Sequence, residues 1–391
     1  MAARARLLWV DALKGIAILW IAYFHFFKAW ANERYPAPFS PDYLSTFFAQ
    51  CAPSGGEATA ACAGKAVFVA FSLLGFHAVS VFLIVSGFGL THSLVTKFAP
   101  GYSWRGWYRA RLLRLFPMYW VAHGVIALSP FVWLAEPIDG RFWLSIAGDR
   151  IWPVESMFFY LNAAWWYFGL LLQLYLVFPL LFLLLRRIGP RAFLLVALLA
   201  TLGVRHLLLS VYPVNGNWVQ GAFFGSRLFE FAAGMALGVW HQRDPSDTER
   251  RLFGVPALMA GVVLYGLGLA SYANIVTYVA TDALVGSGLF LLLTHLAHAC
   301  APRPRLGLIL AQVGAYSYGL YLVHQPYAIY FATLVRSWSI PAAIAAFLPV
   351  LAVLTVLCMA LERLVNRATT WLLAPTPARA PAEAGAGSGP Q

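Results

Sequence analysis

The sequence predicts an all-α polytopic membrane protein, a bundle of about ten transmembrane helices with both termini in the cytoplasm. Of its 391 residues, 61% are hydrophobic and only 11% are charged, whereas soluble domains carry about 25% charged residues. Apolar runs of membrane-spanning length recur along the chain, and basic residues gather on alternate connections between them. These observations exclude a soluble protein and predict both the fold class and its orientation.

The predicted spans are apolar segments that follow one another from near the N-terminus. They lie near residues 9–29, 66–91, 115–135, 163–185, 191–211, 222–240, 252–271, 276–298, 307–334 and 341–361. Aromatic residues make up 16% of the chain, and many lie near segment ends, where amphipathic rings favour the membrane interface. No small-residue cleavage site follows the first apolar run, so we interpret it as a retained helix rather than a signal peptide.

The basic residues on the connections between the predicted spans indicate how the chain is oriented in the membrane. Basic residues are frequent near residues 4–6, 97–114, 186–191, 243–251, 303–305 and 363–367, and few on the other set of connections. Because an excess of Lys and Arg marks the cytoplasmic side, both termini are placed there. The same excess accounts for the net charge of +12 without a nucleic-acid partner. We predict one integral-membrane domain over residues 1–373 and a disordered cytoplasmic tail over residues 374–391, rich in Pro, Ala and Gly.

The four cysteines fall into two groups. Cys51 and Cys62 lie in the predicted outer loop over residues 31–65. An oxidising compartment favours a disulfide between them, and two free thiols are the alternative. Cys300 and Cys358 lie at or inside the membrane, and we interpret them as packing residues.

Lys14 and His25 are ionisable residues within the first span. Eleven positions at about 100° each come to within about 20° of whole turns, so both side chains share one helix face, about 16 Å apart along the axis. Because burying charge in hydrocarbon is costly, ionisable residues at this depth indicate a functional site. The alternative is a lysine that extends to the interface and a histidine satisfied between helices.

Other polar residues occur at membrane depth. They are His77, Ser86, Arg227, Glu230, Asp282 and His324. Glu230 follows Arg227 by three residues, so the two can pair on one helix face. Each residue alone is typical of a structural polar contact, but together they favour a polar path through the bundle.

The segment WRGWYRARLLRLFPMYW, residues 104–120, is rich in arginine at a predicted cytoplasmic boundary. Arg111 and Arg114 share a face if this segment is helical. Guanidinium groups bind phosphate oxygens in a bidentate manner, which favours a phosphorylated ligand. The alternative is the Arg excess that topology alone requires at this boundary.

Six segments of the chain resemble acyltransferase family 3, and they occur in the family's order. The first, VDALKGIAILWIAYFHF, resembles the family's opening helix, in which a basic residue, ten intervening residues and a histidine recur; Lys14 and His25 match that spacing. The others are VFLIVSGF (81–88), YRARLLRLFPMYW (108–120), WWYFGLLLQLYLVFPLL (165–181), EFAAGMALG (230–238) and SYGLYLVHQP (317–326). Each is a weak apolar motif, but six in order are specific.

The resemblance implies an integral-membrane acyltransferase domain over residues 1–373, in the bacterial cytoplasmic (inner) membrane and in contact with membrane lipid. Its implied reaction moves an acyl group, most often acetyl, from cytoplasmic acyl-CoA to a hydroxyl of an extracytoplasmic or lipid-linked carbohydrate, with acetyl-CoA as donor and no metal. His25 is implied as general base or acyl relay, and Lys14, Ser86 and His324 as lining the same catalytic cavity. The implied donor-binding residues are Arg109, Arg111, Arg114 and Lys14.

The chain departs from the family pattern in three ways. Lys14 stands where Arg is commoner, which keeps the charge but loses the bidentate fork. Gln173 lies in the fourth span where many members carry an acidic pair, so no role of those acids carries over. Many relatives also have a fused extracytoplasmic esterase-like domain, which this sequence does not show.

Two other functions are compatible with these residues. One is a transporter of an anionic or lipid-linked substrate, with Lys14 and His25 as a relay along its path. The chain shows neither repeated halves nor paired Gly- or Pro-broken helices of the kind that many transporters have. The other is an acyltransferase that acts on a small molecule rather than a polymer.

Overall fold

The computed structural model describes residues 7–51, 60–129 and 137–372, and the predicted tail over residues 374–391 lies outside them. In these ranges the chain is helical and contains no β-strand. The first helices are α1 (Leu8–Ala31), α2 (Tyr43–Cys51), α3 (Ala60–Leu73), α4 (Ala78–Leu94), α5 (Trp104–Leu128), α6 (Gly140–Ala147), α7 (Val154–Met157) and α8 (Trp166–His206). The others are α9 (Leu228–Arg243), α10 (Pro245–Leu252), α11 (Val255–Ala270), α12 (Ile275–Tyr278), α13 (Thr281–Cys300), α14 (Pro304–Ala315), α15 (Ser317–Leu334) and α16 (Ile340–Leu372).

Several of these helices have the length and hydropathy of membrane spans. Among the described residues, six segments meet both requirements, or seven if the bent pair α14–α15 is one span. They are Leu8–Ala31, Ala60–Leu94, Ala163–Val211, Val255–Ala273, Thr281–Cys300 and Ile340–Leu372. The prediction of an all-α, multi-pass membrane protein is therefore confirmed at this level, while ten spans and cytoplasmic termini stay predictions.

Three predicted spans take an unexpected shape. Residues 163–185 and 191–211 both fall in the helical segment Ala163–Val211. Its main helix, α8, has two arms that meet at Gly189, where the backbone leaves the helical region (φ 81°, ψ 163°). Only glycine adopts this positive φ readily. The predicted span over residues 307–334 is bent by 81° where α14 meets α15. Tyr316 lies at this joint with a non-helical backbone (φ −117°, ψ 26°).

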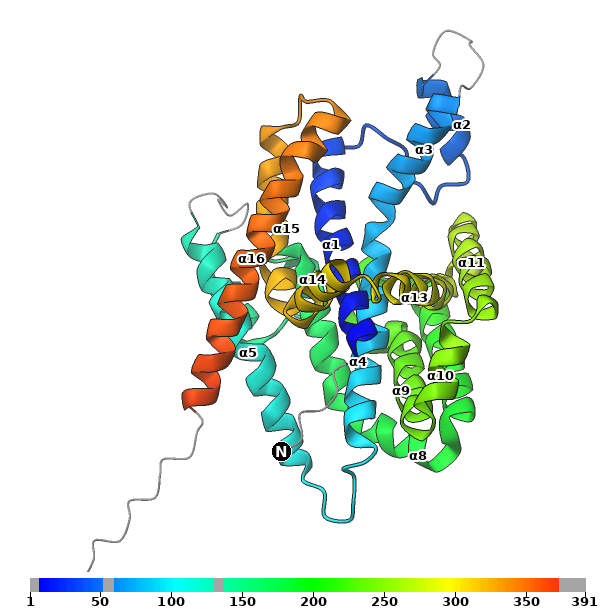
Figure 1. Ribbon diagram of the computed structural model, residues 1–391, viewed down its shortest axis with the longest axis vertical. Helices are drawn as coiled ribbons and strands as arrows, with labels where there is room; N and C mark the ends of the chain where they lie inside the picture. Colours follow the sequence, from blue (N-terminus) through cyan, green and yellow to red (C-terminus); the bar gives the residue numbers. More distant parts are fainter. Residues whose placement is uncertain (1–6, 52–59, 130–136, 373–391) are drawn as a thin grey trace, which may run out of the picture.

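Helix α1 lies at the centre of the bundle, in contact with α4, α13, α14 and α15 (Figure 1). Its approach to α14 depends on Gly314, because a Cβ there would lie 1.7 Å from the carbonyl oxygen of Asp11. Helices α4 and α9 approach as closely: a Cβ on Gly234 would lie 1.8 Å from the carbonyl oxygen of Ile84. Backbone-to-backbone packing at small residues is typical of helices in membranes.

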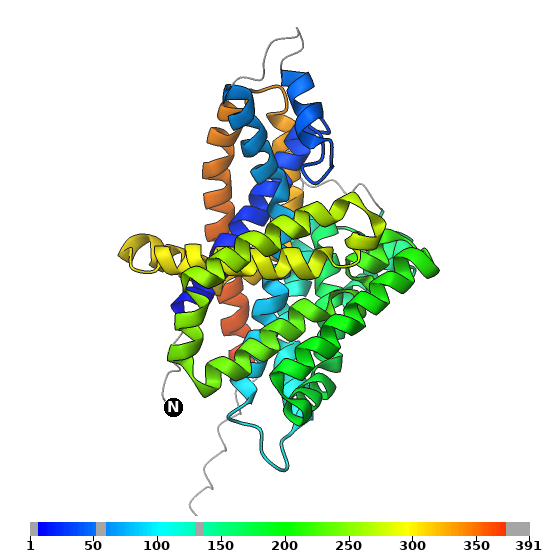
Figure 2. The ribbon, with the colours of Figure 1, turned by 90° about the vertical axis from the view of Figure 1, so that its right-hand side faces the viewer.

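The helices do not all run in one direction. Helices α1, α4 and α16 follow the long axis of the molecule, whereas α13 lies across it (Figure 2). Helix α11 packs along α13. This crossing places the N-terminal end of α13 beside α8 and α9, where Arg205 of α8 meets Asp282 of α13.

The cysteines are arranged as predicted. Cys51, at the end of α2, forms a disulfide with Cys62 of α3, and their Cα atoms are 6.1 Å apart. Cys300 and Cys358 are free and buried. The disulfide therefore connects two short helices in the segment between α1 and α4.

Candidate active site

A cavity of about 190 Å³ lies beside α1, between α4, α5, α8, α14 and α15. Its polar lining includes Lys14, His25, Ser86, Arg114, Tyr167, Tyr175, Ser317, Tyr318 and Tyr321. Its apolar lining includes Ile21, Val79, Phe82, Leu115 and Leu171. Four predicted site residues, from three different helices, therefore share one cavity.

Lys14 and His25 both line this cavity, as their spacing on one face of α1 predicts. Nζ of Lys14 lies 2.7 Å from Oδ1 of Asp11, one helical turn earlier. This ion pair follows from the spacing of three residues on a helix. It holds the ammonium group near the N-terminal end of α1, while the imidazole lies about 16 Å further along the axis.

Gln325 of α15 contacts His25 directly. Nε2 of Gln325 donates to Nδ1 of His25 across 3.2 Å, and Oε1 of Gln325 accepts from the backbone N–H of Ala164 across 2.6 Å. The backbone N–H of Ala164 also donates to Oδ1 of Asn162 across 3.0 Å. An amide nitrogen of Gln325 at 2.6 Å from this N–H would set one donor against another, so the amide nitrogen faces His25 instead. A neutral His25 then carries its proton on Nε2 and its lone pair on Nδ1.

His324 precedes Gln325 on α15 and is fully buried. Its Nδ1 donates to the carbonyl oxygen of Leu320 across 2.9 Å, which leaves the lone pair on Nε2. Nε2 has no hydrogen-bond partner among the described residues. The rings of His324 and His25 are 5.2 Å apart. His324 therefore packs next to His25 but does not line the cavity.

Ser86 and the arginines differ in their position relative to the cavity. Ser86 lines it, with Oγ 3.3 Å from the hydroxyl of Tyr167. Of the arginines on α5, Arg114 lines it, Arg111 stacks over Trp107 at 5.6 Å, and Arg109 is exposed outside it. Of the three predicted donor-binding arginines, only Arg114 therefore lines the cavity, whereas Arg109 and Arg111 do not.

Glu362 and Gln325 are two site residues that the sequence analysis did not single out. Glu362 of α16 is buried, and its Oε2 accepts from the backbone N–H of Gly319 across 2.7 Å. Its carboxylate interacts electrostatically with Arg114 and Lys14. Gln325 lies in the motif SYGLYLVHQP, but its amide does not ionise, so no charge marks it in the sequence.

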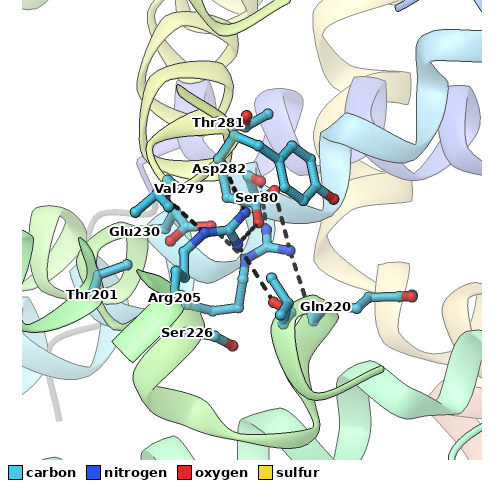
Figure 3. A network of polar contacts seen from close by, with 12 residues as sticks. Ser80, Thr201, Arg205, Gln220, Ser226, Glu230, Val279, Thr281 and Asp282 are labelled. Carbon is cyan, nitrogen blue, oxygen red and sulfur yellow. Dashed lines mark hydrogen bonds and ion pairs between the residues drawn. The ribbon is translucent and has the colours of Figure 1, made fainter. Parts of the chain in front are cut away.

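Figure 3 shows a second polar cluster, formed around Arg205, Glu230 and Asp282. Arg227 donates from Nε to Oε1 of Glu230 across 2.6 Å, which confirms the predicted pair, and from Nη2 to Oγ of Ser80 across 2.7 Å. Arg205 forms an ion pair with Asp282, whose other oxygen lies 3.7 Å from Arg227. Two guanidinium groups thus face two carboxylates among α4, α8, α9 and α13, with no cluster member in the cavity lining.

His77 and Gln173 have structural partners. The two ring nitrogens of His77 lie 3.0 Å from the hydroxyls of Tyr265 and Tyr272. Nε2 of Gln173 donates to the carbonyl oxygen of Ala222 across 3.1 Å, and its Oε1 accepts from the N–H of Phe224. These two hydrogen bonds of Gln173 therefore hold α8 against the segment that precedes α9. Among the described residues, no group of three or more His, Cys, Asp or Glu side chains is placed to hold a metal ion.

The fold and the site together define a multi-pass membrane protein with a cationic, histidine-containing cavity inside its helical bundle. The family model described as acyltransferase domain matches residues 7–363, and the chain belongs to acyltransferase family 3. It is 28% identical over 282 residues to acyltransferase MdmB of Streptomyces mycarofaciens, covering 64% of this chain and 67% of that protein. No solved structure matches the chain.

Proposed function

We propose that this membrane acyltransferase is an O-acyltransferase of the bacterial inner membrane. It moves an acetyl group from acetyl-CoA on the cytoplasmic side to a hydroxyl of an extracytoplasmic or lipid-linked carbohydrate. The observation that supports this most strongly is the shared cavity, which Lys14, His25, Ser86 and Arg114 line together. Family membership supports acyl transfer, and the small volume of the cavity, about 190 Å³, favours a short acyl group.

The cations of the cavity are suited to the donor. Coenzyme A is rich in phosphate, and Lys14 and Arg114 can bind phosphate oxygens at one end of the cavity. The distance of about 16 Å along α1 from Lys14 to His25 is comparable with an extended pantetheine arm. The thioester then lies near His25 while the phosphates stay near the N-terminal end of α1.

His25 is the proposed general base. Its lone pair is on Nδ1, so the acceptor hydroxyl takes the place of the Gln325 amide there, gives its proton to Nδ1 and attacks the thioester carbonyl. The carbon–sulfur bond breaks, and the departing thiolate of coenzyme A takes the proton from His25. The unpartnered Nε2 of His324 can accept from Nε2–H of His25 while the imidazolium exists. In the relay alternative, His25 itself carries the acyl group.

The test is replacement of His25. We expect His25→Ala to lower release of free coenzyme A about 10²–10⁴-fold, to a measurable residual rate, when purified protein is given acetyl-CoA and a hydroxylated carbohydrate. The acetyl group should be lost from cell-surface glycans in mass spectra. His206→Ala, at the exposed end of α8, is the matched control. Unchanged coenzyme A release by His25→Ala would contradict the mechanism, and substrate movement without donor turnover would favour a transporter.

A further inference from the structure

A second cavity, of about 470 Å³, opens where the loop from α4 to α5 meets α8. Its lining includes the rings of Phe98, Tyr102 and Trp104 and the side chain of Arg186. The three ring centroids lie 5.3 to 5.7 Å from one another, and the guanidinium of Arg186 lies 4.7 Å from the Phe98 centroid. We call this site the aromatic pocket.

The surroundings of the aromatic pocket are cationic. Residues 97–114 carry Lys97, Arg105, Arg109, Arg111 and Arg114 and no acidic residue. The pocket lies on the side that the charge distribution predicts to be cytoplasmic. Aromatic rings beside guanidinium groups suit a ligand that is flat and anionic at once, because the rings stack on a heterocycle while the guanidinium groups bind phosphate.

Two buried donors adjoin both sites without lining either cavity. The ring centroid of Trp107 lies 6.0 Å from that of Trp104 in the aromatic pocket and 6.1 Å from that of Tyr175 in the central cavity. Nε1 of Trp107 and Nε of Arg111 are buried and have no hydrogen-bond partner in the described part of the chain. Arg111 interacts electrostatically with Tyr102 of the pocket and with Tyr175 of the cavity. Leaving a buried donor unpaired is unfavourable, and phosphate oxygens between the two sites would pair with both donors.

We propose that the aromatic pocket binds the adenine nucleotide end of the acyl-CoA donor, with the diphosphate at Trp107 and Arg111. The inference rests on the proposed function, because it assigns the remote end of the same donor. Trp104 is seven residues before Arg111, about 10.5 Å along the helix axis, a length comparable with that of an adenine, its ribose and the first phosphate taken together. Arg114, one turn beyond Arg111, already lines the cavity that would hold the pantetheine arm and thioester.

The experiment separates the two ends of the donor. Purified full-length protein is titrated calorimetrically with adenosine 3′,5′-bisphosphate, and acyl transfer is measured with acetyl-CoA and with acetyl-pantetheine, which lacks the nucleotide. We expect Arg186→Gln to weaken nucleotide binding and to lower kcat/KM for acetyl-CoA, each about tenfold, the loss of a charge-assisted contact. Its kcat/KM for acetyl-pantetheine stays unchanged. Arg187→Gln, an equal change of charge one position away, leaves all three values within about twofold.

Three results would overturn the inference: no binding of the bisphosphate by wild-type protein that turns over acetyl-CoA, an equal loss for both donors in Arg186→Gln, or competition by inorganic pyrophosphate as strong as by the nucleotide. The last would show an anion site without a place for the base. If the nucleotide binds as expected but neither donor is turned over, the pocket stands and the proposed function fails.

Discussion

The side-chain amide of Gln325 joins His25 to the backbone of Ala164. It donates to Nδ1 of His25 across 3.2 Å and accepts from the N–H of Ala164 across 2.6 Å. Turning the amide over would place its nitrogen 2.6 Å from the N–H of Ala164, so that two donors face each other. Gln325 therefore sets both the position of the imidazole and the nitrogen that carries its proton.

Replacement of Gln325 tests this positioning role. We expect Gln325→Ala to lower kcat for acyl transfer about tenfold or more with little change in KM for acetyl-CoA, because the donor phosphates are held elsewhere. In protein that already carries His25→Ala, the same change should cause no further loss, since the two residues act as a unit. Independent, additive losses from the two substitutions would show that Gln325 does not act through His25.

The charge at position 14 is the next test. Lys14 pairs with Asp11 and lines the cavity, and we propose that it holds donor phosphate. Lys14→Arg should retain most of the activity, whereas Lys14→Ala should raise KM for acetyl-CoA about tenfold, in line with one lost charge-assisted contact. Lys65→Ala, which removes an exposed lysine outside the cavity, is the control. Equal KM values for wild type and Lys14→Ala would exclude a donor contact.

Gly314 is required for the close approach of α14 to α1. A Cβ there would lie 1.7 Å from the carbonyl oxygen of Asp11 and 2.7 Å from the nitrogen of Gly15, and neither backbone atom can move without separating the helices. We expect Gly314→Ala to destabilise the protein by about 1–3 kcal/mol and to lower activity, because Asp11 positions Lys14. Gly89→Ala, where a Cβ meets nothing within 4 Å, should be neutral or stabilising in the same thermal unfolding assay.

The sequence predicted those parts of the site that depend on local geometry. Lys14 and His25 could be placed on one face because helical periodicity is local, and Glu230 could be paired with Arg227 for the same reason. The contact between His25 and Gln325 joins residues 300 positions apart, and nothing in the pattern of either helix indicates it. The burial of Glu362 beside the cavity likewise depends on how α16 packs against α15, which only the tertiary fold decides.

The bend between α14 and α15 was also beyond the sequence pattern. Its apolar residues read as one continuous span, and Tyr316 at the joint is neither Gly nor Pro. The bend lies directly after Gly314, where α14 touches the backbone of α1. Tertiary contact between backbones, rather than a helix-breaking residue, thus accompanies the change of direction.

The disulfide between Cys51 and Cys62 should stabilise the protein without taking part in transfer. It closes a loop with a sequence separation of 11, for which chain entropy predicts about 3 kcal/mol. Neither cysteine lines the cavity. We expect the double Cys→Ser variant to unfold at a lower temperature and to keep its kcat at temperatures where it is folded. A reductant should lower the Tm of wild-type protein and leave that of the variant unchanged.

The buried ion cluster predicts a large effect of a single neutralisation. Asp282→Asn removes the carboxylate that faces both Arg205 and Arg227 and leaves buried guanidinium charge uncompensated, for which about 3–5 kcal/mol of destabilisation is typical. The matched control is Asp247→Asn on α10, which removes the partner of Arg250 and Arg251, two side chains that are each 77% exposed. Solvent screens these charges, so stability should change little. Both variants are compared by equilibrium unfolding in detergent, with coenzyme A release measured on the folded fraction. Because the cluster lies outside the cavity, folded Asp282→Asn protein should keep its kcat. Equal stability of the two variants would mean that water or a neighbouring group already compensates Arg205 and Arg227.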